Sequence, residues 1–461
     1  MQQPGRRRSA RSPARLPPTY SEPHADTKLD DFAIASLPAA APGGSPPKPA
    51  LQAMGFGAQG LKALFHIFNL PVCVVLLAFG EGLLGTFVYS SIAAVAGVQA
   101  LLYAILFLFA ASTTAQGWIT FGHPAKVIGA ANSSGPFDRG ARALFGMRDF
   151  SQPADAGLAH ARQVHIDVAG SSGARLGAWH TLPCSHTRDV LEMVARGEAT
   201  ADAAFDQALR TRPVDDDGTS PLAALYLHGN FESRAKWVST EHSRLLSSHF
   251  GLHVLVIDYR GFADSTGGPP TPDTLGEDAH AAIDWLSARG LPPSRVLLYG
   301  HSLGTGAAAQ LALRLQAYGT MPFGAVLEAP FFSLRAAALT FPAALPLLAL
   351  PGGLGLVLSR FMDGCRTADA LVALPRLSVL ILHGDEDTTV PIQHSVELVR
   401  RLRAARLPSA IRAAGGRGKA AIFRYETLEG CDHLQALLHP KTILALSEFV
   451  RAVAERQDQE A

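Results

Sequence analysis

The sequence has few charged residues and no excess charge of either sign. Charged residues make up 17% of the 461 residues, and 40 basic side chains nearly balance 39 acidic ones. This balance argues against a basic surface that binds nucleic acid, and no nucleic-acid-binding motif is present, so we predict no nucleic-acid partner. The scarcity of charge, with a mean hydropathy of +0.15, instead indicates contact with a membrane.

Cysteine is also scarce. The four cysteines are widely separated and form no C-x-x-C pair: Cys73, Cys184, Cys365 and Cys431. This spacing excludes a cysteine zinc site and a thioredoxin-type redox site, and we predict neither a metal nor a cofactor. Because Cys73 lies in an apolar run, three cysteines remain elsewhere, and this odd number does not favour a disulfide framework. Whether two of these three cysteines form a disulfide stays open.

The segment 1–60 is poor in the apolar residues that a folded core needs. It is rich in Pro, Ser, Ala and Arg, and it includes "GRRRSARSPARLPP". We predict a disordered basic tail, which is too polar and too long to be a cleaved signal peptide. Its arginines are typical of the cytosolic side of a membrane span. The alternative is a solvated tail that plays no role in membrane topology.

The segment 61–120 is almost free of charge and is the predicted membrane anchor. The window 92–111 has the length of a membrane-crossing helix, with Gln99 as its polar residue. An earlier window, 70–89, carries Glu81 between two glycines, so it predicts either a weaker first span or a hairpin broken at that triplet. A buried helical pair in a soluble protein is the alternative for the whole segment.

The segment 149–461 alternates short apolar runs with helix-like stretches. A leading hairpin is predicted over 164–168 and 176–181. Buried strands are predicted at 222–228, 253–259, 296–299, 324–328 and 378–383, and helices at 275–289, 303–318 and 393–403. This alternation predicts an α/β fold with a mainly parallel sheet flanked by helices.

One turn in this segment matches G-x-S-x-G, a motif that presents a serine as a nucleophile. Gly300 and Gly304 flank Ser302, with a predicted strand before the turn and a predicted helix after it. Side chains at the two glycine positions would clash with the neighbouring strand and helix. A plain strand-to-helix turn is the alternative.

A nucleophilic serine needs a base that is oriented by an acid, and in this fold the acid and then the histidine follow the serine. Asp387, in the loop after 378–383, is the predicted acid, with Asp385 and Glu328 as alternatives. His433, in the loop after a final strand candidate, is the predicted base, and a surface histidine is its alternative reading. Two other histidines after Asp387 lie at predicted helix starts, His394 and His439.

The tetrahedral intermediate of acyl transfer also needs two N–H donors for its oxyanion. Leu303, the residue after the nucleophile, supplies one of them. The second is predicted from Asn230 or Phe231, in the loop that follows the strand at 222–228.

With these residues identified, the chain from 164 to 453 resembles the α/β-hydrolase superfamily. Within it, the chain is most similar to the membrane-anchored lysophosphatidylserine and monoacylglycerol lipases. The matching motifs are "LGAWHTLP", "LYLHGN", "VIDYRGFADSTGGPP", "YGHSLGTGAA", "LEAPF" and "ILHGDEDTTVP". The resemblance implies Ser302 as nucleophile, Asp387 as acid and His433 as base, with Asn230 and Leu303 at the oxyanion hole.

The chain departs from the family pattern in a few places. Phe231 and Glu232 follow H-G-N where the family has a small pair, which affects the shape of the oxyanion loop. Ala263 stands where glycine is common. The segments 186–217 and 406–420 are interpreted as surface insertions away from the chemistry.

A further uncharged run, 336–359, is long enough to span a membrane. A span there would place Ser302 and Asp387 on opposite sides of the bilayer, so a working triad excludes it. We predict a cap at about 331–375 that lines an acyl-chain pocket. Helices that only cover the core are the alternative.

These features together predict a membrane-anchored serine hydrolase of monoacylglycerol or lysophospholipid. The alternatives are a palmitoyl-protein thioesterase and a catalytically silent lipid-binding or interaction protein. The sequon at Asn132 and the family resemblance favour a lumenal catalytic domain in the endoplasmic reticulum, whereas two spans would return the domain to the cytosol. Oligomeric state stays open.

Overall fold

The computed structural model describes residues 90–91, 93–104, 150–170, 173–212, 216, 218–340, 364–414 and 421–459. Contacts divide the chain into Met1–Gly57 and Ala58–Ala461, and every described residue lies in the second unit. The predicted tail lies outside the described residues, as do residues 341–363 of the predicted cap and the earlier span at 70–89.

An eight-stranded sheet forms the centre of the described domain, in the order β1-β2-β4-β3-β5-β6-β7-β8. The antiparallel pairs are β1 with β2 and β2 with β4, and the remaining pairs are parallel. The predicted α/β fold with a mainly parallel sheet is therefore confirmed. The strands are β1 (Ala161–Asp167), β2 (Arg175–Thr181), β3 (Ala223–Leu227), β4 (His253–Ile257), β5 (Val296–His301), β6 (Gly324–Glu328), β7 (Val379–Gly384) and β8 (Phe423–Leu428).

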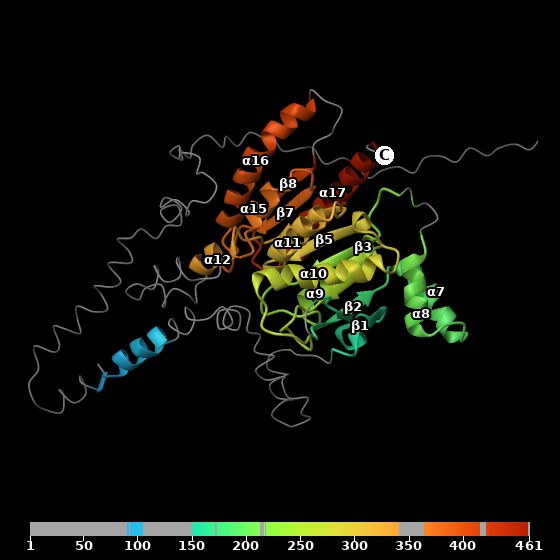
Figure 1. Cartoon of the computed structure of the whole chain (residues 1–461), viewed down its shortest axis with the longest axis horizontal. Helices are drawn as coiled ribbons and strands as arrows, with labels where there is room; N and C mark the ends of the chain where they lie inside the picture. The colour runs from blue at the N-terminus through green and yellow to red at the C-terminus, as the bar shows by residue number, and fades with distance from the viewer. Residues whose placement is uncertain are drawn as a thin grey trace, which may run out of the picture. The chain divides into compact units, whose positions relative to one another are not determined.

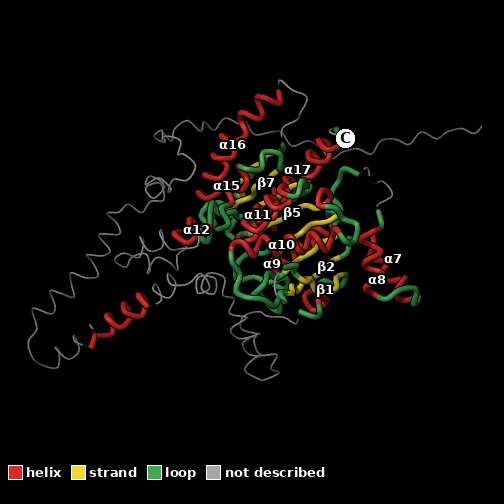
Figure 2. The backbone as a smooth tube through the Cα atoms, viewed as in Figure 1, coloured by secondary structure: helices red, strands yellow, loops and turns green. Residues whose placement is uncertain are grey.

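Helices enclose the sheet on both sides, as Figures 1 and 2 show. The α-helices among the described residues after 150 are α7 (Cys184–Ala195), α8 (Ala201–Arg210), α9 (Trp237–Arg244), α10 (Pro272–Ser287), α11 (Leu303–Ala317), α12 (Leu334–Thr340), α15 (Thr367–Val372), α16 (Gln393–Ala414) and α17 (Pro440–Asp458). Short helical turns are η2 (Pro153–Ala156), η3 (Leu245–His249), η4 (Pro293–Arg295) and η6 (Ala436–Leu438).

The alternation of side chains along the buried strands builds two cores, one on each face of the sheet. On one face, Leu225 and Leu227 of β3 belong to a cluster that also includes residues of α10, α11, α15 and α16. On the other face, Tyr226 of β3 belongs to a second cluster that includes Leu446 and Phe449 of α17. Because neighbouring residues of a strand point to opposite faces, a strand covered on both faces is apolar throughout, as these runs are.

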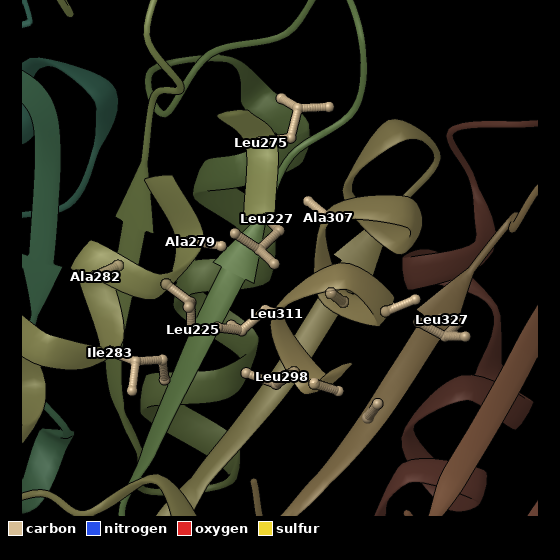
Figure 3. Close-up of a cluster of buried hydrophobic side chains, with 14 of the residues drawn as sticks. Leu225, Leu227, Leu275, Ala279, Ala282, Ile283, Leu298, Ala307, Leu311 and Leu327 are labelled. Carbon is tan, nitrogen blue, oxygen red and sulfur yellow. The ribbon is translucent and has the colours of Figure 1, made fainter. Parts of the chain in front are cut away.

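The core between the sheet and helices α10 and α11 holds the strand before the G-x-S-x-G turn in place. Figure 3 shows side chains of β3, β5, β6, α10 and α11 directed toward one another, and its labels are Leu225, Leu227, Leu275, Ala279, Ala282, Ile283, Leu298, Ala307, Leu311 and Leu327. Leu225 and Leu298 are fully buried. The small alanines of α11 let this helix approach the sheet closely.

The predicted insertion at 186–217 is largely helical in its described residues and contributes α7 and α8. These helices lie side by side (Figure 1) and bury their own small cluster, which includes Leu182, Val190 and Phe205. The segment at 406–420 begins as helix, because α16 continues to Ala414 rather than ending near 403.

The predicted span at 92–111 is described over 93–104, and these residues are helical. Among the described residues, no helix combines the length and apolar character needed to cross a membrane. Cys184, Cys365 and Cys431 are free thiols, with Cys184 exposed and the other two buried, whereas Cys73 lies outside the described residues.

Candidate active site

The G-x-S-x-G sequence forms a sharp turn between β5 and α11. Ser302 has φ of 50° and ψ of −114°. Residues other than glycine rarely adopt this left-handed φ, which projects the serine out of the strand direction. A Cβ atom at Gly304 would overlap the carbonyl oxygen of Leu227, and one at Gly300 would overlap that of Gly304. Both glycines are therefore required sterically, and the start of α11 is packed against the end of β3.

Asp387 and His433 meet where β7 and β8 end. The Nδ1 atom of His433 lies 2.7 Å from Oδ2 of Asp387. The other oxygen of Asp387 accepts the backbone N–H groups of Thr389 and Val390, each at 2.8 Å. An ionised carboxylate can only accept, so Nδ1 of His433 carries the proton and Nε2 is left able to accept one.

The surroundings of Asp387 keep it ionised. Burial alone would raise the pKa of this carboxyl, but the neighbouring rings of His383 and His433 and the Val390 N–H hold it well below its usual range. His383 lies 3.3 Å from Oδ2 of Asp387 and is itself bonded to the Ser395 hydroxyl and the Val390 carbonyl. Asp387 is thus a fixed anion against the His433 ring.

The two alternative acids do not contact His433. Asp385 accepts the N–H of Gly430 at 2.8 Å. Glu328 is buried, and its Oε2 accepts the Tyr299 hydroxyl at 2.6 Å and lies 2.9 Å from Nε2 of His242. His394 and His439 stand at the beginnings of α16 and α17, as the sequence predicts.

The candidate oxyanion donors lie at the ends of two neighbouring parallel strands. Leu227 of β3 is in register with Gly300 of β5, so the Asn230 loop and the start of α11 are adjacent. Leu303 is the first residue of α11, where backbone N–H groups have no partner within the helix. Phe231 has φ of 56°, and its side chain is exposed.

Ser302 and His433 are brought to the same edge of the sheet without a direct bond. Within the described residues, no hydrogen bond joins the Ser302 hydroxyl to the His433 ring. They are linked through His301, whose Nε2 lies 3.0 Å from the His433 carbonyl oxygen. Catalytic hydrogen bonds are often long before substrate binds and shorten in the complex.

Two buried residues beside the turn are not assigned by the sequence patterns, Glu232 and His301. Oε1 of Glu232 lies 3.3 Å from Nδ1 of His301, and Oε2 accepts the Gly229 N–H at 3.1 Å. The sequence signal for this pair was Glu232 itself, which stands where the family has a small residue after H-G-N. A carboxylate at this place has to be paired when it is buried.

The described residues include no cluster of His, Cys, Asp or Glu arranged to hold a metal ion.

Comparison with known proteins places this arrangement in a family. Residues 225–320 match the alpha/beta hydrolase fold. Lysophosphatidylserine lipase ABHD12 of Danio rerio is 30% identical over 310 residues, which are 66% of this chain and 73% of that protein. This chain belongs to the α/β-hydrolase family. Protein ABHD12B of Homo sapiens is 37% identical over 240 residues, 50% of this chain, and the chain spans 60% of the length of that relative.

A solved structure was also matched, an esterase from Pyrococcus furiosus. The two chains are 15% identical, and the match covers 65% of this chain and 92% of the esterase chain, with a TM-score of 0.43.

One departure from the α/β-hydrolase pattern is explained by backbone geometry. Ala263 has φ of 42°, in the left-handed region where a Cβ atom is unfavourable. Glycine adopts this conformation at little cost, so the expected glycine at this place fits the backbone better than alanine does.

Proposed function

We propose that this chain is a membrane-anchored serine hydrolase that cleaves the carboxylic ester of a monoacylglycerol or a lysophospholipid. The observation that carries the proposal is the bond between His433 and Asp387 at the sheet edge where the turn presents Ser302. Similarity to a lysophosphatidylserine lipase supports the lipid substrate. The membrane anchor rests on the uncharged window at 92–111.

The proposed reaction proceeds through an acyl-enzyme. Nε2 of His433 takes the proton of Ser302 as Oγ attacks the ester carbonyl, while Asp387 holds the imidazolium that forms. The N–H groups of Leu303 and Asn230 bind the oxyanion. The bond between the acyl carbon and the glycerol oxygen then breaks, and His433 returns the proton to that departing oxygen. Water, activated by His433, attacks the acyl-enzyme and releases the fatty acid and free Ser302.

A panel of substrates presented to the full chain in detergent micelles tests this proposal. We expect fatty-acid release from monoacylglycerol or lysophosphatidylserine to be at least about tenfold faster than from triacylglycerol or a palmitoylated thioester peptide. This expectation follows from the sequence prediction that a cap at about 331–375 lines an acyl-chain pocket, which a single acyl chain would fill. Fatty-acid release from the thioester alone would identify a palmitoyl-protein thioesterase. If no substrate is cleaved and Ser302 is not labelled by a fluorophosphonate, the silent alternative holds.

We further propose that a single span at 92–111 places the catalytic domain in the lumen of the endoplasmic reticulum. The basic residues of segment 1–60 and the sequon at Asn132 support this orientation. In intact microsomes, the catalytic domain should resist added protease, and Asn132→Gln should abolish an electrophoretic shift caused by glycosylation. Digestion of the domain without detergent would show that it faces the cytosol.

A further inference from the structure

The loop that carries His433 is bonded to the residue just before the nucleophile. His301 is fully buried, and its Nε2 lies 3.0 Å from the carbonyl oxygen of His433. The two rings also approach, with their centroids 5.0 Å apart. Because a carbonyl oxygen can only accept, this contact requires a proton on Nε2 of His301.

The other nitrogen of His301 faces a carboxylate. Nδ1 lies 3.3 Å from Oε1 of Glu232, whose side chain is 3% exposed. A neutral imidazole carries one N–H group, whereas both nitrogens of His301 face acceptors. The doubly protonated ring donates from Nε2 to the His433 carbonyl and places its positive charge beside the Glu232 carboxylate, so Glu232 and His301 form a buried ion pair.

The second oxygen of Glu232 holds the oxyanion loop. Oε2 accepts the backbone N–H of Gly229, the residue before Asn230, at 3.1 Å. One buried carboxylate therefore connects the loop after β3 to the loop after β8, with His301 between them. Neither contact involves the reacting atoms.

We propose that Glu232 is a positioning residue that acts through His301 to hold the His433 loop and the Asn230 loop in register around Ser302. The proposal rests on the proposed function, because it assigns Glu232 a role in the same acyl transfer. A misplacement of about 1 Å between catalytic groups lowers rates by on the order of 100-fold, so a bond that fixes both loops has a large effect on rate.

The charge states favour this role over a wide pH range. Burial alone would lower the pKa of His301, but the Glu232 carboxylate raises it to about 9. Burial would likewise raise the pKa of Glu232, but His301 lowers it to about 2. The titratable groups around His301 are Glu232, Glu328, His242 and His433. As the pH rises toward 9, His301 loses its second proton and the ion pair is lost.

The test measures the rate at which a fluorophosphonate labels Ser302 in the full chain, as a function of pH. In the wild type we expect the rate to fall as the pH passes about 9. Glu232→Gln should be labelled about 10- to 100-fold more slowly at neutral pH. The pH at which its labelling rate falls should be lower than in the wild type. Glu232→Asp keeps the charge and should recover part of the rate.

The matched control is Asp278→Asn. Asp278 is a fully buried carboxylate on α10 that pairs with Arg260 and makes no contact with the triad. Its variant should be labelled at the wild-type rate per folded molecule. The folded fraction of every variant is measured by thermal unfolding. The comparison separates a positioning role from the general loss of a buried charge.

Each outcome decides the proposal. Equal rates and equal pH limits in wild type and Glu232→Gln would overturn the positioning role and leave the proposed function standing. A folded wild type that is not labelled would overturn the proposed function, and the positioning role with it. If Glu232→Gln does not fold, the wild-type profile is decisive, because a rate that stays level beyond pH 9 contradicts the role of the ion pair.

Discussion

Replacing Ser302 with alanine is expected to lower ester hydrolysis by on the order of 10⁵- to 10⁶-fold and to abolish labelling by a fluorophosphonate. The strained turn presents this side chain at the sheet edge where His433 is held by Asp387. The variant removes the nucleophile and leaves the backbone of the turn unchanged. Steady-state hydrolysis and mass spectrometry of the labelled protein measure the two effects.

Ser243→Ala is the matched control for this experiment. Ser243 is a fully buried serine of α9 whose hydroxyl donates to the Ser239 carbonyl at 2.8 Å. It should be labelled and should hydrolyse substrate like the wild type. An adduct that persists in Ser302→Ala, or that maps to another residue, would contradict the assignment of the nucleophile.

The second large effect is expected for Asp387→Asn, with kcat reduced about 10⁴-fold. An amide is neutral, so it cannot stabilise the His433 imidazolium, and its NH₂ group can turn His433 into the wrong tautomer. The fold should be retained because the replacement is nearly isosteric. Measurement of kcat and KM at neutral pH distinguishes this loss from weaker substrate binding, which would raise KM alone.

Asp385→Asn is the control, because Asp385 lies two residues away and was the nearest alternative acid. Its carboxylate accepts the Gly430 N–H and does not contact His433. Loss of one exposed hydrogen bond is worth about 1 kcal/mol, so kcat should change by less than about tenfold. A reversed order of the two effects would assign the acid to Asp385.

Much of the fold could be predicted because its signals are local in the sequence. The run at 324–328 and strand β6 coincide, and β5 continues two residues beyond its predicted end into the turn that carries Ser302. Apolar runs bounded by glycine and polar residues are sufficient to identify strands buried on both faces. The end of α16 was predicted less well, since the helix continues to Ala414 through a segment interpreted as an insertion.

The candidate site was predictable only in part. The turn at Ser302 has a local motif, and Asp387 follows a recognisable strand, but the choice between Asp387 and Asp385 needed the 2.7 Å contact with His433. The buried pair of Glu232 and His301 had no sequence motif. His301 and His433 are 132 residues apart in the chain, and their contact depends on the register of four strands.

The sequence by itself determined the positions of the strands, the glycines of the turn, and the order of serine, acid and histidine. Those features follow from backbone preferences and from the periodicity of apolar residues, which act over a few neighbouring residues. The tertiary structure alone decided which carboxylate meets His433 and that Glu232 is buried beside His301. Distances between side chains on separate loops are set by sheet register and packing, and no short stretch of sequence contains them.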